Sequence, residues 1–334
     1  MTDLDLTSRH LGQGLLAHPL GVNLGAVGLP GNLPRERDDG PFLDGLRRAV
    51  ELGANLLDTA DSYGAGRAER LVGRLLREYP DRTFLTSSKV GRIRGSAPHA
   101  YADRHIHHQL QQTLENLYAE ELDLYTLDSW DFGPQDRYLG TAIDQMHTLR
   151  EVGAIKAIGM QGPYTPAAAT PAERAACAER FLHLFRLIRP NVLWTRCNAL
   201  TPVITLEGED LFAFTARHGV GVILAAPKAP GLRAGLTPSG AETVPGGLEE
   251  LHTRFGDAPG TLTRLALLSG VQRAGHCATV VGFSSETQLE ESFGTLSGPV
   301  LTAGELRTLD DAYARARAQM HPKPKERLPA GTGM

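Results

Sequence analysis

Three side chains that can hold or move a proton follow predicted strands in the first third of the chain. Asp58 lies near the end of the apolar run ANLLDTA (54–60), and Tyr63 follows in DTADSYG. Lys89 lies near the end of the next apolar run, TFLTSSKV (83–90). If these strand ends meet, Asp58 would keep Lys89 charged, and Lys89 would stabilise the phenolate of Tyr63. Tyr63 would then be a general acid or base, with a purely structural Asp58–Lys89 ion pair as the alternative.

The elements that must position these residues alternate along the chain. Short apolar runs that are continuous in hydrophobicity predict strands buried on both faces of a parallel sheet. Eight strand candidates occur, most of them continuous in hydrophobicity, at residues 22–27, 54–60, 83–90, 122–127, 154–160, 191–197, 219–226 and 278–283. Amphipathic helical patterns such as FLDGLRRAVELG lie between them. This order predicts a (β/α)8 barrel, in which catalytic groups gather at the carboxyl ends of the strands. A doubly wound sheet is less favoured, because no GxGxxG turn follows the first strand.

We expect residues 1–334 to form a single barrel domain with a core at about 20–320. The first residues predict an N-terminal hairpin or arm, and GELRTLDDAYARARAQM predicts an extra C-terminal helix. The tail at 321–334 is expected to be mobile. Two long loops, at 162–171 and 226–247, follow the fifth and seventh strands.

Composition and charge exclude several classes of function. The net charge is -4 without a basic block, so neither nucleic acid nor an anionic membrane surface is an expected partner. The sequence contains no run of about 18 apolar residues, so we expect no membrane-spanning helix. The N-terminus lacks the apolar segment of a signal peptide. The cysteines at 177, 197 and 277 are scattered, which predicts a reducing cytoplasm and no metal site. We therefore expect a cytoplasmic protein, a monomer or weak homo-oligomer, that acts on a small molecule.

Several segments, in order, resemble the aldo-keto reductase superfamily. GANLLDTADSYGAGRAERLVGRLL resembles its signature, FLTSSKVGR its lysine strand, LDLYTLDSWD and REVGAIKAIGMQG its fourth and fifth strands, and VVGFSSETQLEESF its last strand and helix. The likeness covers about residues 20–295 and is nearest to the sugar and aldose dehydrogenase branch. It implies a barrel that binds NADPH without a Rossmann fold and transfers a hydride to or from a carbonyl, or a C=C or C=N bond. Tyr63 would be the proton donor, supported by Asp58 and Lys89.

The resemblance also implies a set of cofactor contacts. They are Gly25, Ala26, Val27, Asp58, Gln161, Trp194, Ala226, Gly231, Leu232, Phe283, Ser284, Ser285, Gln288 and Ser292. Gln161 replaces the family's residue for the nicotinamide carboxamide and can still form amide hydrogen bonds. Trp194 stands at the position of a glutamine and would either stack on the nicotinamide or belong to the core. The segment GFSSETQ lacks a basic residue for a 2′-phosphate, so NADH is an alternative to the expected NADPH.

Asp128 takes the place of the histidine that normally ends the family's fourth strand. A neutral histidine donates a hydrogen bond to the substrate oxygen, whereas an ionised aspartate cannot donate. Three interpretations stay open. Asp128 could be protonated by burial and donate strongly, it could be ionised and stabilise a cationic acceptor such as an iminium, or ordinary carbonyl reduction could have been lost. We expect Tyr63, Asp128 and Trp130 to contact the substrate. The alternative function is a cofactor-binding regulatory or interaction protein with little turnover.

Overall fold

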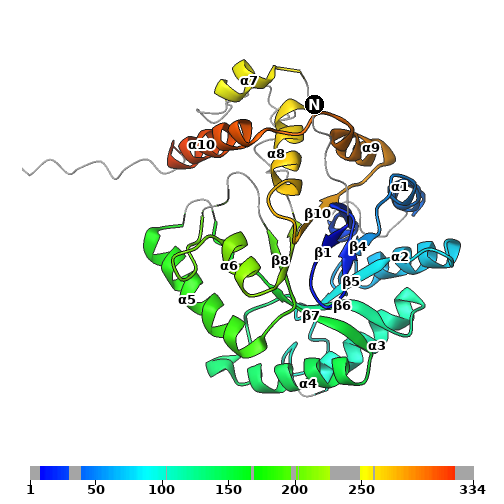
Figure 1. Cartoon of the computed structure of the whole chain (residues 1–334). Helices are drawn as coiled ribbons and strands as arrows, with labels where there is room; N and C mark the ends of the chain where they lie inside the picture. The colour runs from blue at the N-terminus through cyan, green and yellow to red at the C-terminus, as the bar shows by residue number, and fades with distance from the viewer. Residues whose placement is uncertain are drawn as a thin grey trace, which may run out of the picture.

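Eight parallel strands close into a barrel, with helices around its outside (Figure 1). The computed structural model describes residues 8–29, 39–102, 104–166, 169–196, 201, 203–225, 249–258 and 260–319. The barrel strands are β3 (Leu20–Asn23), β4 (Leu56–Asp58), β5 (Leu85–Val90), β6 (Leu122–Leu127), β7 (Ile155–Gln161), β8 (Val192–Arg196), β9 (Gly221–Ala225) and β10 (Cys277–Gly282). They follow one another around the barrel, and β10 closes it by pairing with β3. The predicted (β/α)8 fold is confirmed.

Helices follow the strands and cover the barrel wall. They are α1 (Gly40–Glu51), α2 (Arg67–Glu78), α3 (His105–Leu117), α4 (Leu139–Glu151), α5 (Pro171–Ile188), α6 (Leu211–Arg217), α7 (Glu249–Phe255), α8 (Thr261–Val271), α9 (Glu286–Gly294) and α10 (Ala303–Gln319). Short 3-10 turns are η1 (Gly25–Gly28), η2 (Pro134–Asp136) and η4 (Thr295–Ser297). The extra C-terminal helix of the sequence analysis is α10. No helix among the described residues has both the length and the apolar character needed to cross a bilayer.

The predicted N-terminal hairpin consists of β1 (Arg9–His10) and β2 (Leu16–Ala17), which pair antiparallel. Its side chains Leu11 and Leu15 are buried in one cluster with the deep residues of the barrel interior. The backbone of Leu11 approaches the first residue of β9 so closely that a Cβ on Gly221 would lie 2.3 Å from the Leu11 carbonyl oxygen. The hairpin therefore closes the barrel at the amino ends of its strands.

Alternate residues of each strand face the barrel interior and the others face the helices, which explains why most of the predicted strands do not alternate between apolar and polar residues. The deep layer contains Leu56 and Leu85, while the outward residues pack beneath the helices. The register pairs Asn23 with Asp58 at the carboxyl ends of β3 and β4, and it pairs Asp58 with Ser87 in the middle of β5. The interior is thus apolar at depth and polar at the mouth, where the first strands end.

The first strand is shorter than predicted. The prediction of 22–27 extends past the end of β3 at Asn23, and residues 25–28 form η1. The side chain of Asn23 accepts a hydrogen bond from the Gly25 N–H (2.9 Å), which turns the chain. A Cβ on Gly28 would lie only 3.0 Å from the Gly64 nitrogen, so glycine permits this close approach. Other predicted features, Ala226, Gly231, Leu232, Cys197 and the tail, lie outside the described residues.

Candidate active site

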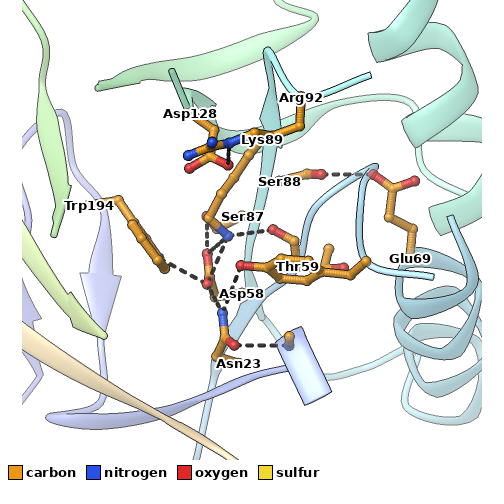
Figure 2. Close-up of polar contacts among 12 residues, drawn as sticks. Asn23, Asp58, Thr59, Glu69, Ser87, Ser88, Lys89, Arg92, Asp128 and Trp194 are labelled. Atoms are coloured by element: carbon orange, nitrogen blue, oxygen red, sulfur yellow. Dashed lines mark hydrogen bonds and ion pairs between the residues drawn. The ribbon is translucent and has the colours of Figure 1, made fainter. Parts of the chain in front are cut away.

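A buried ion pair between Lys89 and Asp58 forms the centre of the barrel mouth (Figure 2). The Lys89 ammonium donates to Asp58 Oδ1 (2.8 Å), Asp58 Oδ2 (2.9 Å) and the Thr59 carbonyl oxygen (2.6 Å). An ammonium has three N–H groups, so these acceptors match its full donor capacity. Both side chains are inaccessible to solvent, at 1% and 0% exposure. The ammonium is therefore fixed in place.

The charge of Lys89 is determined by its neighbours. Burial disfavours the ammonium form, but the negative charges of Asp58, of Tyr63 as phenolate and of Asp128 outweigh that penalty. The pKa of Lys89 is consequently raised above its ordinary value. Lys89 is a permanent cation at neutral pH and is not a proton carrier.

Further donors converge on the Asp58 carboxylate. The hydroxyl of Ser87 donates to Oδ1 (2.9 Å), and the indole N–H of Trp194 donates to Oδ2 (3.0 Å). The Asn23 amide also donates to Oδ2. These groups come from β5, β8 and β3, on both sides of β4. These donors and the Lys89 ammonium together fix the position of the Asp58 carboxyl group at the barrel mouth.

Tyr63 lies beside this pair, on the turn between β4 and α2. Its ring centre is 5.0 Å from the Lys89 nitrogen, and its hydroxyl is 3.5 Å from Asn23 Nδ2. The turn requires left-handed backbone at Gly64 (φ 64°), Ala65 (φ 51°) and Gly66 (φ 79°), which explains the sequence YGAG. The structure thus brings together the three side chains that the sequence analysis grouped, with Tyr63 half-buried at the open side.

Asp128 lies at the same mouth and is ion-paired with Arg92. Its backbone N–H donates to the Val90 carbonyl (2.9 Å), and its Oδ2 accepts from Arg92 Nε (3.0 Å). The Asp128 side chain is only 10% exposed, whereas that of Arg92 is 45% exposed. Sequence reasoning missed Arg92, although a basic residue two positions beyond a strand of the mouth is a signal that could have identified it.

Trp194 and Asn23 both have polar roles in the network. Trp194 is buried among the residues of the barrel interior, yet its N–H contacts Asp58 and its ring centre is 4.9 Å from the Lys89 nitrogen. Trp194 thus belongs to the barrel core, one of the two possibilities left open above, and its N–H also serves the polar network, while its stacking on a nicotinamide stays a prediction. Asn23 was not identified from the sequence. The signal for it was a polar residue at the end of an apolar strand, beside the strand that carries Asp58.

Two further acids are buried behind Tyr63. Glu69 accepts hydrogen bonds from Ser88 (2.7 Å), Thr113 (2.8 Å) and Asn116 (2.8 Å). Neither carboxylate oxygen of Asp61 accepts a hydrogen bond of good geometry from the described residues. Burial, reinforced by the negative charges of Glu69 and Asp128, raises the pKa of Asp61 to about 7. Asp61 thus differs from its hydrogen-bonded neighbour and titrates near neutral pH.

The predicted cofactor contacts fall into two groups. Gln161 is half-buried at the end of β7, and its side-chain amide has no partner among the described residues. Ser284, Ser285 and Gln288 lie at the start of α9, where the Ser285 hydroxyl caps the helix and the Gln288 side chain accepts from Ser284. Gly25 and Ala26 lie on η1. These positions are near the carboxyl ends of β7, β10 and β3.

The other predicted contacts have side chains in the core. Val27 and Phe283 are buried, and Phe283 packs against Phe42 at a ring distance of 6.1 Å. The hydroxyl of buried Ser292 donates to the Gln288 carbonyl (2.7 Å). Trp130, predicted as a wall of the substrate pocket, is half-buried, and its indole N–H donates to the Gln161 carbonyl (2.9 Å). Trp130 therefore ties the end of β6 to the end of β7.

A hollow of about 440 Å³ lies apart from this mouth. Thr195 of β8, Leu224 of β9, Phe212 of α6, Ser269 of α8 and Tyr313 of α10 contribute to its lining. None of Asp58, Tyr63, Lys89 or Asp128 lines it. Thr195 and Leu224 alternate with the interior residues Trp194 and Ala225, whereas Arg196, which also lines the hollow, is the last residue of β8. The hollow therefore lies against the outer face of β8 and β9 and reaches the carboxyl end of β8.

The whole chain is similar to known oxidoreductases. The sequence model described as "Aldo/keto reductase family" matches residues 24–314. L-galactose dehydrogenase of Arabidopsis thaliana is 24% identical over 311 residues, which cover 88% of this chain and 91% of that protein. D-threo-aldose 1-dehydrogenase of a Pseudomonas species is 27% identical over 185 residues, covering 49% and 55%. The predicted likeness to sugar dehydrogenases is confirmed.

Solved structures show the same fold. A glycerol dehydrogenase from Gluconobacter oxydans has a TM-score of 0.71 at 17% identity, covering 94% of this chain and 97% of that one. An aldo/keto reductase from Klebsiella pneumoniae, solved in complex with NADP and acetate, has a TM-score of 0.65 at 20% identity, covering 96% and 98%. With the family match over most of its length, the chain therefore belongs to the aldo/keto reductase family of oxidoreductases.

Proposed function

We propose that this protein transfers a hydride between a nicotinamide cofactor and the carbonyl group of a small molecule, with Tyr63 as general acid or base. The observation that carries the proposal is the buried Asp58–Lys89 pair with the Tyr63 ring 5.0 Å from the ammonium. A fixed cation beside a half-exposed phenol suits proton transfer at an open site. A purely structural ion pair would not require a tyrosine at this position.

The described residues fit a nicotinamide cofactor. Gln161 presents an unpartnered amide at the mouth, where it would hold the carboxamide. The first turn of α9, with Ser284 and Ser285, would bind a phosphate through its N–H groups. That turn carries the acid Glu286 and no basic residue, so its side chains do not favour a 2′-phosphate. We therefore propose NADPH, as in the family, with NADH as the alternative.

The roles of the protein's own groups follow from their charges. When bound, the reduced nicotinamide supplies the hydride that adds to the carbonyl carbon. Tyr63 would give its proton to the carbonyl oxygen as the C=O double bond becomes a C–O single bond. Lys89 would stabilise the phenolate that remains, and Asp58 would hold Lys89 in position. In the reverse direction the Tyr63 phenolate would take the proton from the alcohol.

The Arg92 ion pair bears on the interpretations of Asp128. The Arg92 guanidinium donates to Asp128 Oδ2, so this oxygen acts as an acceptor in the ion pair and not as the donor that the first interpretation requires. The guanidinium also neutralises the charge that would otherwise attract an iminium, so this pair supports C=O rather than C=N as the reacting bond. Relatives named as dehydrogenases of L-galactose and of D-threo-aldose support carbonyl–alcohol interconversion over C=C reduction.

Two measurements test the proposal. Fluorescence titrations with NADPH and NADH should show binding well below millimolar concentration, and a carbonyl panel should show oxidation of the reduced nucleotide. Tyr63→Phe should lower kcat by about a hundredfold or more, because it removes the proton donor but keeps the ring. Tyr118→Phe, at a tyrosine that is 60% exposed on the outer surface, is the control. Unchanged kcat in Tyr63→Phe would rule out its role.

A further inference from the structure

The guanidinium of Arg92 has an unused donor edge at the barrel mouth. Its Nε donates to Asp128 (3.0 Å), and no other hydrogen bond joins its side chain to the described residues. The Arg92 side chain is 45% exposed, and Nη1 and Nη2 make no hydrogen bond to the described residues while Nε is held by Asp128. A guanidinium has five N–H donors in a rigid fork, and Asp128 uses one of them. The edge formed by Nη1 and Nη2 is therefore available to a ligand.

The backbone that carries this pair is firmly anchored. The hydroxyl of buried Tyr101 accepts a hydrogen bond from the Ser129 N–H (3.0 Å). The same hydroxyl can donate its hydrogen to the Ser129 carbonyl (3.0 Å) or to the Val90 carbonyl (3.3 Å). Val90 and Ser129 are close in sequence to Arg92 and Asp128, respectively. A Cβ on the intervening Gly91 (φ 118°) would lie 2.1 Å from the Tyr101 oxygen. Tyr101 thus joins the two segments and limits the freedom of the Arg92 backbone.

The position of the pair separates it from the groups that handle the proton. In Figure 2, Asp128 and Arg92 lie at one end of the polar network and Asn23 at the other, with the Asp58–Lys89 pair between them. The hydroxyl of Tyr63 is at the Asn23 end, 3.5 Å from its amide nitrogen. Lys89 has used its three donors within the protein. Arg92 is therefore the cation of this network that can bind a second group of a substrate.

The geometry points to Arg92 as a specificity residue that binds a carboxylate on the carbonyl substrate, with Asp128 as the positioning residue that aims its fork. This inference rests on the proposed function, because it concerns the substrate of the same site. The substrate class is that of oxo acids, in which a carboxylate is separated by a few bonds from the carbonyl that Tyr63 protonates. A carboxylate matches the paired N–H groups of the fork in a bidentate contact.

The charge of Asp128 does not prevent this contact. A bound carboxylate would touch Nη1 and Nη2, on a different edge of the guanidinium from the one that Asp128 holds. Coulomb attraction to the touching cation exceeds repulsion from the more distant anion, because the energy falls with distance. A cationic substrate is disfavoured, since the Asp128 carboxylate is already paired with Arg92.

The first experiment compares oxo acids with their neutral esters on the wild-type enzyme. Pyruvate, levulinate and 5-oxohexanoate place the carboxylate at increasing distance from the ketone, and each is tested beside its methyl ester with saturating NADPH. We expect at least one acid to have a kcat/KM about tenfold or more above that of its ester. Equal or better use of every ester would overturn the inference.

The second experiment changes the cation. Arg92→Gln should raise KM for the preferred acid by about ten- to a hundredfold, the loss expected for a hydrogen-bonded charge pair. It should leave kcat/KM for the ester within about threefold. Arg94→Gln, at an exposed arginine two positions further on, is the matched control and should behave as wild type. An equal loss for acid and ester would show a structural role and overturn the inference.

A third variant distinguishes binding of a substrate carboxylate by Arg92 from an ion pair of Arg92 with Asp128 that has no role in substrate binding. Asp128→Asn keeps an oxygen that can accept from Arg92 Nε but removes the nearby negative charge. KM for the acid should therefore fall severalfold relative to the ester, whereas a rise specific to the acid would count against the assignment.

Direct binding distinguishes a failure of this inference from a failure of the proposed function. Titration calorimetry with pyruvate, levulinate and 5-oxohexanoate in the presence of NADP⁺ requires no turnover. Loss of acid binding in Arg92→Gln would support the anion site even if no carbonyl were reduced. Binding of the acid that is independent of Arg92 would reject the anion site even in an active enzyme.

Discussion

Asp58 and Lys89 depend on each other because both are buried. Lys89→Met removes the only cation bonded to Asp58 among the described residues and leaves a carboxylate without its counter-charge. Breaking a buried pair in this way costs about 3–5 kcal/mol. We expect that loss in urea unfolding, with kcat lowered by about a hundredfold or more because the Tyr63 phenolate loses its cation.

The double variant Asp58→Asn/Lys89→Met provides the control for this prediction. It removes both charges, so most of the lost stability should return while kcat stays low. If the double variant were less stable than Lys89→Met, the ion pair would not be the cause of the instability.

The raised pKa of Asp61, about 7, predicts a dependence of stability on pH. The folded protein holds this proton more tightly than the unfolded chain, in which an aspartic acid titrates near about 3.9. The stability from this group is therefore full below about pH 4 and is lost as the pH rises through about 7. The groups acting on it include Glu69, Asp128 and Lys89.

Asp61→Asn tests this dependence, because the amide is neutral at every pH. The variant should be more stable than wild type by roughly 2–4 kcal/mol near pH 8 and by less near pH 5. Urea unfolding at the two pH values measures the difference. Asp81→Asn, at an exposed acid, is the control. An advantage of Asp61→Asn that did not increase with pH would contradict the assignment.

The buried hydroxyl of Tyr101 connects the segments that follow β5 and β6, and it limits how far these two strand ends can move apart. Tyr101→Phe would remove the acceptor of the Ser129 N–H and a donor to the Ser129 and Val90 carbonyls. We expect a loss of about 1–3 kcal/mol in the free energy of unfolding, the cost of unsatisfied buried groups. Tyr118→Phe should lose little. A Tyr101→Phe protein as stable as wild type would show that these bonds are replaced by water.

Strands whose ends are marked by neighbouring residues in the sequence could be predicted. The run at 122–127 is the whole of β6, and the acids Glu121 and Asp128 border it, although Asp123 lies inside the strand. The first strand was predicted too long, because 22–27 is apolar apart from Asn23, and the side chain of this residue forms the turn that ends the strand. Local patterns therefore located the strands better than the turns that follow them.

Partners far apart in the chain could not be predicted in the same way. Arg92 and Asp128 are 36 residues apart, and Trp194 and Asp58 are 136 apart. No local pattern joins such residues, because the register of the barrel brings them together. Asp58, Tyr63 and Lys89 could be grouped because Asp58 ends β4, Tyr63 follows that strand and Lys89 lies near the end of β5, and the carboxyl ends of both strands face the same mouth.

The whole molecule is organised with its active-site mouth at one end of the barrel and the N-terminal hairpin at the other. This separation predicts that the hairpin stabilises the fold without affecting the reaction. Leu11→Ala should cost about 2–5 kcal/mol, because Leu11 is fully buried against the deep barrel layer and its loss leaves a cavity. Leu16→Ala is the matched control, since Leu16 belongs to the same hairpin but is 45% exposed. Urea unfolding should separate the two variants clearly, while KM for the nucleotide and kcat stay at wild-type values in both. A change of KM in Leu11→Ala under conditions where the protein remains folded would mean that the deep layer transmits strain to the mouth, and the two ends of the barrel would not be independent.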